Sequence, residues 1–198
     1  MTDDYDPTLD SLMSWEVCIN AMRERYIVGK RTDYPKIEKD FYRTPAHAVE
    51  PLLAHLNRDT LFDEPCCGDG ALVRHLQAAG HHCNFASDID PKMDTAPIIN
   101  AMDRDDCKGE MFITNPPYTW KVLDPMITHL SGMAPTWLLL PADMMHNKRM
   151  APHIKRCRII QSVGRVKWFD DKSGMENSAW YLFTHSDHGH TKFYGRQQ

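Results

Sequence analysis

Several features are missing from this sequence of 198 residues, and each absence removes a class of protein. The sequence has no run of about 18 apolar residues, which is the length that a membrane-spanning helix needs. The acidic N-terminus also lacks the basic and then apolar pattern of a signal peptide. There is no internal repeat and no low-complexity tract. The length suits one domain that buries one sizeable core.

Regular cysteine spacing is missing as well. None of the six cysteines forms a C-x-x-C pair, which is typical of reduced thiols in a cytoplasmic protein. The adjacent Cys66 and Cys67 could suggest a catalytic thiol, but small residues inside a glycine turn explain them better. His185, His188 and His190 resemble a metal cluster in composition, yet they follow the strands that we expect, and we predict no metal site.

Excess positive charge is absent, since the net charge is −4, and this argues mildly against a strong non-specific binder of nucleic acid. The distribution is uneven, however. Residues 1–16 carry five acids and no base, whereas residues 148–172 and 23–43 are rich in bases. A polyanion can dock on these two basic segments if they fold onto one face, although a solvated surface is the plainer interpretation. The bases are Lys148, Arg149, Lys155, Arg156, Arg158, Arg165, Lys167 and Lys172, and Arg23, Arg25, Lys30, Arg31, Lys36, Lys39 and Arg43.

The pattern of apolar residues predicts how the chain is organised. Residues 8–28 have helical spacing, so we expect residues 1–40 to form a helical extension packed on a main domain at 41–198. In that domain Thr44 is expected to cap a helix that begins at Pro45 and runs to about residue 56. Further helices are expected at 71–79, 122–130 and 144–156, and strands at 60–63, 83–87, 111–114, 136–140, 159–163, 166–169 and 179–184.

Strands that alternate with helices predict an α/β fold with a doubly wound, mostly parallel sheet. Ligands of such sheets bind at the carboxyl ends of the strands. After the first strand the sequence reads Asp-Glu-Pro-Cys-Cys-Gly-Asp-Gly, in which Gly68 and Gly70 allow a tight turn and a close approach to a ligand. The dinucleotide fingerprint is incomplete, because Val73 stands where a third glycine would be.

Two further segments follow strand ends. Asp88 comes about 20 residues after the glycine turn, where an acid can hold two ribose hydroxyls, and Ile89 can lie against a flat ring. The third strand runs into Asn115-Pro116-Pro117-Tyr118. The Asn115 side-chain oxygen and the Pro116 carbonyl can both accept hydrogen bonds from one planar amino group, and Tyr118 can stack on the ring that carries it. This tetrapeptide indicates chemistry on a planar nitrogen.

Taken together, these segments resemble the amino-group DNA methyltransferases that use S-adenosylmethionine. The family's cofactor segment appears as Phe41-Tyr42-Arg43-Thr44-Pro45, its glycine motif as residues 64–70, and its catalytic tetrapeptide as residues 115–118. The resemblance covers residues 38–184 and implies a Rossmann-like fold of the class I methyltransferase type. It implies cofactor contacts from Phe41, Thr44, Pro45, Glu64, Pro65, Cys66, Gly68, Gly70, Asp88, Ile89, Asp103 and Asn115, with Asp103 on the adenine amino group of the cofactor.

The resemblance implies methyl transfer to an exocyclic amino nitrogen, with adenine N6 in DNA, duplex or single-stranded, as the first choice. Asn at the first position of the tetrapeptide favours adenine over cytosine. No insertion is long enough for a separate recognition region, apart from residues 170–178, so we expect weak sequence preference, or a homodimer or partner that supplies specificity. Candidate substrate contacts are Trp168, Phe169, Lys148, Arg149, Arg165 and Lys167. RNA adenine, protein glutamine and a catalytically silent cofactor-binding subunit are the alternatives.

Overall fold

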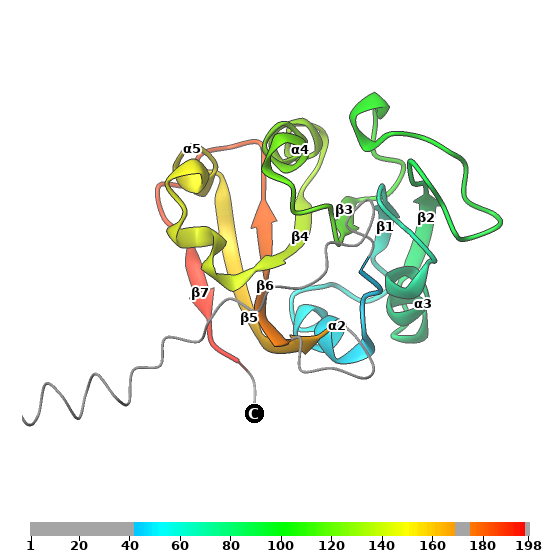
Figure 1. Ribbon diagram of the computed structural model, residues 1–198, viewed down its shortest axis with the longest axis horizontal. Coiled ribbons are helices and arrows are strands. Elements are labelled where there is room, and N and C mark those ends of the chain that lie inside the picture. Colours follow the sequence, from blue (N-terminus) through cyan, green and yellow to red (C-terminus); the bar gives the residue numbers. More distant parts are fainter. Residues whose placement is uncertain (1–41, 169–174, 197–198) are drawn as a thin grey trace, which may run out of the picture. The chain divides into compact units, whose positions relative to one another are not determined.

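A seven-stranded sheet forms the centre of the protein in the computed structural model, which describes residues 42–168 and 175–196 (Figure 1). The order of its strands is β2-β1-β3-β4-β6-β5-β7. The extension at residues 1–40 and the helix expected within it lie outside the described residues, and its packing stays a prediction. The strands are β1 (Leu61–Glu64), β2 (His82–Ala86), β3 (Met111–Thr114), β4 (Thr136–Pro141), β5 (Cys157–Lys167), β6 (Met175–Phe183) and β7 (Lys192–Tyr194).

The first four strands run parallel, and β6 runs antiparallel between β4 and β5. The chain leaves β1 for β2 on one side and then returns to β3 on the other side. This reversal is the topological switch point, outside which doubly wound sheets bind ligands at the carboxyl ends of their strands. The carboxyl ends of β1, β2 and β3 therefore meet at one edge, where Glu64 pairs with Ala86.

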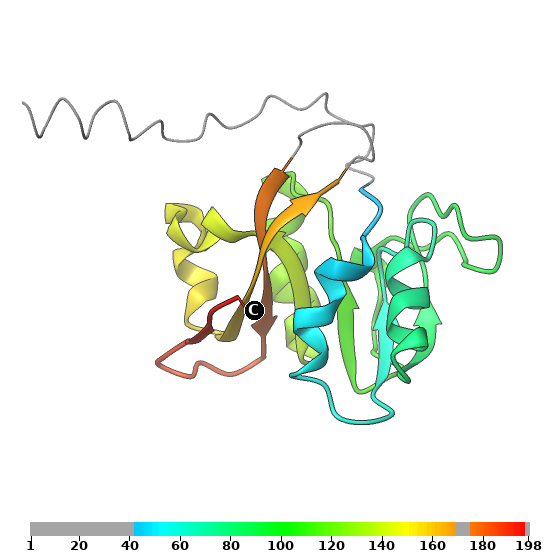
Figure 2. The same ribbon diagram turned by 90° about the horizontal axis from the view of Figure 1, so that it is seen from below.

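Helices cover both faces of the sheet (Figures 1 and 2). The apolar run of β4 shows why: Trp137 and Leu139 pack with α2 (Ala46–Leu53) and α3 (Ala71–Ala78), whereas Leu138 and Leu140 pack with α4 (Trp120–Met133). Successive side chains of a strand point to opposite faces, so a strand buried on both faces must be apolar throughout. The predicted doubly wound α/β sheet is confirmed.

Helix α2 buries one face against the sheet through Ala48, Val49 and Leu52. The indole Nε1 of Trp180 on β6 donates a hydrogen bond of 2.7 Å to the carbonyl of Ala48. The start of this helix differs from the prediction, because Pro45 is the cap residue and makes no side-chain hydrogen bond. The Thr44 hydroxyl instead accepts a hydrogen bond from the Asn115 side chain, as described below.

Other differences lie in the C-terminal half. Residues 142–150 form two 3₁₀ turns, η3 (Ala142–His146) and η4 (Lys148–Met150), before the short helix α5 (Ala151–Ile154). The two short strands expected at 159–169 are one strand, β5, with register shifts near Cys157 and Ser162. Residues 175–178, expected in a loop, belong to β6. Strand β7, which the sequence did not reveal, pairs in parallel with β5.

Candidate active site

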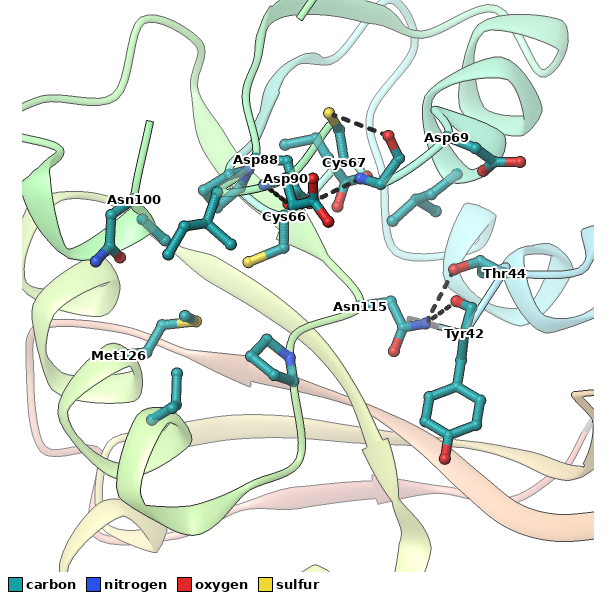
Figure 3. A pocket seen from close by; sticks show the side chains of 18 of the residues that line it. Tyr42, Thr44, Cys66, Cys67, Asp69, Asp88, Asp90, Asn100, Asn115 and Met126 are labelled. Atoms are coloured by element: carbon teal, nitrogen blue, oxygen red, sulfur yellow. Dashed lines mark hydrogen bonds between the residues drawn. The ribbon is translucent and has the colours of Figure 1, made fainter. Parts of the chain in front are cut away.

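A cavity of about 570 Å³ opens at the carboxyl ends of β1, β2 and β3 (Figure 3). It lies outside the switch point, where the topology predicts a ligand. Its walls come from the segment before α2, the glycine turn, the loop after β2, the turn η2 (Ala101–Asp103) and the start of α4. The lining residues are Tyr42, Arg43, Thr44, Glu64, Pro65, Cys66, Cys67, Gly68, Asp69, Ala71, Leu72, Asp88, Ile89, Asp90, Lys92, Asn100, Ala101, Met102, Asn115, Pro117, Lys121, Val122, Pro125 and Met126.

The glycine turn has the tight backbone conformation that its sequence predicts. Gly68 and Gly70 have φ angles of +51° and +76°, in the left-handed region that favours glycine. A Cβ atom on Gly70 would stand 2.8 Å from the Sδ atom of Met93, so a side chain there would also collide with the loop after β2. Gly68 lines the cavity and Gly70 does not, which makes the contribution of Gly70 conformational.

Asp88 ties the glycine turn to the loop after β2. One of its carboxylate oxygens accepts a hydrogen bond of 2.8 Å from the backbone N–H of Gly68, and the other accepts one of 2.8 Å from Asp90. A carboxylate oxygen accepts more than one hydrogen bond, so Asp88 can still receive hydroxyl groups from the cavity that it lines. Ile89 is 60% exposed beside it, as expected of an apolar residue that awaits a flat ring.

Glu64 is a buried ionisable residue of the site. Its residue is 1% exposed, and neither carboxylate oxygen has a hydrogen-bonding partner of normal geometry in the described part of the chain. Burial raises the pKa of this carboxyl well above its ordinary value. Hydrogen bonding with the Thr114 side chain opposes this rise, the nearby Asp88 charge adds to it, and the Asn115 backbone opposes it slightly. An unpartnered carboxyl on a cavity wall is costly unless a ligand with a donor or positive charge satisfies it.

The Asn115 amide is held in one orientation by the segment before α2 (Figure 3). Its Nδ2 group donates hydrogen bonds of 3.1 Å to the Tyr42 carbonyl and 3.2 Å to the Thr44 hydroxyl. A carbonyl only accepts, so the nitrogen must face Tyr42 and the Oδ1 atom must face away from it. Oδ1 accepts a hydrogen bond of 2.9 Å from the Tyr118 hydroxyl. Asn115 thus presents an acceptor at the edge of the cavity.

The remaining residues of the tetrapeptide take different places. Pro117 lines the cavity, Pro116 is buried, and Tyr118 lies beside the cavity with its hydroxyl on Asn115. Arg43 forms an ion pair of 2.8 Å with Asp69 in the glycine turn. The segment before α2 therefore contacts both the glycine turn and the tetrapeptide at residues 115–118.

The loop before β3 places Asn100, rather than Asp103, at the cavity. Asn100, Ala101 and Met102 line it, whereas Asp103 does not. The Asn100 side chain accepts a hydrogen bond of 3.0 Å from the Met102 backbone N–H and caps η2. Sequence reasoning missed Asn100, although an Asn directly before a short turn is a capping signal.

A buried ion pair fixes the end of this loop. Arg104 lies 2.5 Å from Asp63 on β1, and its guanidinium stacks over the rings of Phe85 and Phe112 at 4.7 and 5.5 Å. Asp63 also accepts a hydrogen bond of 2.8 Å from the Lys108 backbone N–H. Because both charges are buried and paired, the loop is anchored to the centre of the sheet.

Other residues predicted from the sequence lie away from the cavity. Pro45 caps α2 and does not line it. Trp168 is 8% exposed and packs in the core, so it forms no open wall. Phe41 and Phe169 lie outside the described residues. Lys148, Arg149, Arg165 and Lys167 are exposed, but none of them lines the cavity.

Three of the cysteines that the structure describes are held as neutral thiols. Burial is the main cause that raises the pKa of Cys67 to about 12 and that of Cys107 to about 11, and it raises the pKa of Cys66 further still. A thiol reacts as its thiolate, so none of these three is an activated nucleophile. The described residues hold no group of three or more side chains suited to a metal ion, the C-terminal histidines included. Within the same residues, no helix has the length and apolar character needed to cross a membrane.

Solved structures share this architecture at low sequence identity. A putative RNA methyltransferase from Pyrococcus horikoshii has a TM-score of 0.51 at 13% identity, over 77% of this chain and 90% of that one. A dimethyladenosine transferase from Plasmodium falciparum has a TM-score of 0.50 at 16% identity, over 72% and 62%. A putative class I S-adenosylmethionine-dependent methyltransferase from Listeria monocytogenes has 0.48 at 12%, over 77% and 63%. The likeness to the first two structures shows a shared Rossmann-like α/β fold.

No protein-family model matches the chain, and no curated protein matches it in sequence. S-adenosylmethionine is the cofactor expected of a class I methyltransferase fold, and the cavity residues fit it. The unpartnered Glu64 carboxyl suits a cationic amino group, Asp88 suits ribose hydroxyls, and Asn100 with Ile89 suits a flat ring that carries polar edges. The left-handed Gly68 lets the backbone come close to the ligand.

Proposed function

We propose that this chain transfers a methyl group from S-adenosylmethionine to an exocyclic amino nitrogen, and that its acceptor is N6 of adenine in DNA. The orientation of the Asn115 amide carries the proposal. Two hydrogen bonds hold its nitrogen against Tyr42 and Thr44, so its oxygen is fixed as an acceptor at the carboxyl end of β3. An acceptor oriented in advance needs no rotation of the amide when an amine arrives.

The proposed chemistry follows from the properties of the amine that receives the methyl group. The lone pair of such a nitrogen is conjugated with its ring, so the amine is a poor nucleophile. A hydrogen bond from one N–H to Asn115 Oδ1, and a second to the Pro116 carbonyl, would favour a pyramidal nitrogen and stabilise the charge that develops on it. The bound cofactor supplies an electrophilic methyl group. The nitrogen forms a bond to the methyl carbon as the carbon–sulfur bond breaks, and then loses one proton to solvent.

The cofactor would be held by residues at the ends of β1 and β2 and in the loop before β3. Glu64 would pair with its amino group, Asp88 would accept its ribose hydroxyls, and Asn100 would lie at its adenine ring. Phe41, which lies outside the described residues, keeps the contact that the resemblance implies as a prediction. We assign Asn100 rather than Asp103 to the adenine ring because only Asn100 lines the cavity.

RNA adenine is the second candidate. The similar structures from Pyrococcus horikoshii and Plasmodium falciparum are a putative RNA methyltransferase and a dimethyladenosine transferase. The amide of a protein glutamine poses the same chemical problem and is the third candidate. A silent cofactor-binding subunit is disfavoured, because Asn115 and Tyr118 are present and linked by a hydrogen bond.

Binding of nucleic acid is proposed to rest mainly on phosphate contacts. Arg165 and Lys167 are exposed on β5, the strand that leads to Trp168, and Trp168 packs against Tyr42 beside the catalytic segment. Such contacts position a nucleic acid but read little of its sequence. We therefore expect weak sequence preference from this chain alone, with a homodimer or a partner as the source of any longer recognition sequence.

Labelled methyl transfer tests the proposal. The purified chain is given S-adenosylmethionine with a labelled methyl group and equal amounts of single-stranded DNA, duplex DNA, RNA or unfolded protein, with Asn115→Ala as the matched control. The proposal expects label on DNA, at adenine N6 after digestion to nucleosides, and none with the control. Label confined to RNA or protein would replace the DNA assignment by the corresponding alternative. Cofactor binding without transfer to any acceptor would support a silent subunit.

A further inference from the structure

Two tyrosine rings lie nearly parallel beside the Asn115 amide. The rings of Tyr42 and Tyr118 have an interplanar angle of 11° and centroids 6.3 Å apart. Both residues are tied to the same side chain, since Tyr118 donates its hydroxyl hydrogen bond to Asn115 Oδ1 and the Tyr42 carbonyl accepts one from Nδ2. Both tyrosines therefore lie next to the acceptor atom.

Trp168 stands behind this pair rather than within it. Its ring meets that of Tyr42 at an angle of 61° with centroids 5.9 Å apart, and it is 8% exposed. Tyr42 lines the cavity, whereas Trp168 does not. Trp168, which the sequence suggested as a wall for the target base, thus supports Tyr42 from the core.

We propose that Tyr42 is a substrate-contacting residue and forms, opposite Tyr118, the second face of a slot for the aromatic ring that carries the acceptor amine. This inference rests on the proposed function. Carbon atoms in van der Waals contact stand about 3.5 Å apart, so a ring between two others needs about 7 Å. The centroid distance of 6.3 Å is the upper limit of the spacing between the two ring planes, so the slot opens only when Tyr118 moves away from Tyr42.

The same displacement prepares the acceptor. While Tyr118 donates its hydrogen bond to Asn115 Oδ1, it occupies one of the two lone pairs that the amine would use. When the ring enters and Tyr118 moves onto its face, that lone pair becomes accessible to the amine. Entry of the ring and exposure of the Asn115 Oδ1 lone pair therefore occur together. A base must leave its stack to reach such a slot.

The slot also distinguishes classes of acceptor. Stacking on aromatic side chains holds an unstacked base whatever its sequence context. A glutamine side chain has an amide NH₂ but no ring, so it gains nothing from Tyr42. The geometry therefore assigns the chain to nucleobase acceptors and predicts that Tyr42 contributes to affinity for the acceptor rather than for the cofactor.

The test compares Tyr42→Leu with Tyr42→Phe, because both keep the backbone carbonyl that holds Asn115 and only the second keeps a ring. Phe193→Leu, on exposed β7, controls for loss of an aromatic residue elsewhere. Methyl transfer to a single-stranded oligonucleotide with one adenine gives KM and kcat, and calorimetry gives the cofactor Kd. Tyr42→Leu should raise KM on the order of 5- to 100-fold, the loss expected for one base–aromatic stack, with an unchanged cofactor Kd. Tyr42→Phe should recover most of that loss.

A second readout uses an oligonucleotide in which 2-aminopurine, a fluorescent adenine analogue, replaces the adenine. Its emission in the complex should be quenched by the wild type and by Tyr42→Phe, and brighter with Tyr42→Leu. Wild-type KM and quenching in Tyr42→Leu would overturn the slot while leaving the proposed function intact, and so would a loss confined to the cofactor Kd. A wild-type chain that binds cofactor but methylates only a glutamine peptide would overturn both.

Discussion

Replacing Glu64 by glutamine should stabilise the cofactor-free protein at neutral pH and weaken its binding of the cofactor. The carboxyl is 1% exposed, and among the described residues no hydrogen bond of normal geometry reaches its oxygens. Burial raises its pKa well above the ordinary value of 4.5. In the unfolded chain the pKa is ordinary, so the folded state holds the proton more tightly. The stabilisation from this proton is complete below about pH 4.5 and is lost as the pH rises toward the folded pKa.

The size of the effect follows from linkage. One proton held by the folded state alone changes the free energy of unfolding by about 1.4 kcal/mol for each pH unit between the two pKa values. The Glu64→Gln variant has the same shape and no charge, so this slope should be missing. Its stability relative to the wild type should therefore increase with pH by about that amount per unit until the folded pKa is passed.

Cofactor binding should favour the ionised Glu64 carboxyl, whereas folding without cofactor favours the protonated one. A cationic amino group beside Glu64 favours the ionised carboxyl, so binding should release a proton and the affinity of the wild type should rise with pH through this window. The variant should show no such rise. Its affinity should be lower by roughly 10- to 100-fold, which corresponds to the loss of a hydrogen bond to a charged group.

Urea denaturation of the two proteins between about pH 5 and about pH 7, with and without cofactor, measures both effects. Glu110→Gln, at an exposed glutamate, is the matched control and should follow the wild type. A constant difference in unfolding free energy between wild type and Glu64→Gln across that range would refute the reasoning, because Glu64 would then be ionised in the free protein.

Three other perturbations separate the parts of the site. Asn115→Ala should lower kcat on the order of 10²- to 10³-fold, as loss of one preorganised partner does, and calorimetry should find the cofactor Kd little changed. Asp88→Ala should weaken cofactor binding by about 1.5–3 kcal/mol in the same titration; unaltered binding would remove Asp88 from the cofactor site. Arg104→Met should destabilise the fold by roughly 3–5 kcal/mol in urea, because it leaves the buried Asp63 unpaired, and a loss below about 1 kcal/mol would mean that the pair anchors nothing.

The sequence predicts the elements of the cavity best where a motif follows a parallel strand. Glu64, Asp88 and Asn115 each come directly after an expected strand, and the topology brings their strand ends to one edge whatever the details of packing. The continuous burial of β4 explains the same success for the core, since a continuous apolar strand has to be covered on both faces.

Prediction failed where short turns decide which side chain faces inward. Asn100 and Asp103 are three residues apart on a 3₁₀ turn, and the hydrogen bond from Met102 to Asn100 selects the one that lines the cavity. The aromatic contact of Tyr42 with Tyr118 was hidden for another reason. It joins a segment before the first described helix to a loop after β3, and no local pattern records a contact over such a distance.

The hydrogen bond between Trp180 and Ala48 spans 132 residues and has a consequence for the order in which the chain folds. A ribosome releases α2 long before β5 and β6, and until those strands arrive the apolar face of α2 lacks its cover from them. Tyr42 and Thr44 directly precede α2, so they reach their places beside Asn115 only when α2 docks. In a nascent chain, the hydrogen bonds from Asn115 to Tyr42 and Thr44 are therefore expected to form only after the C-terminal strands have emerged.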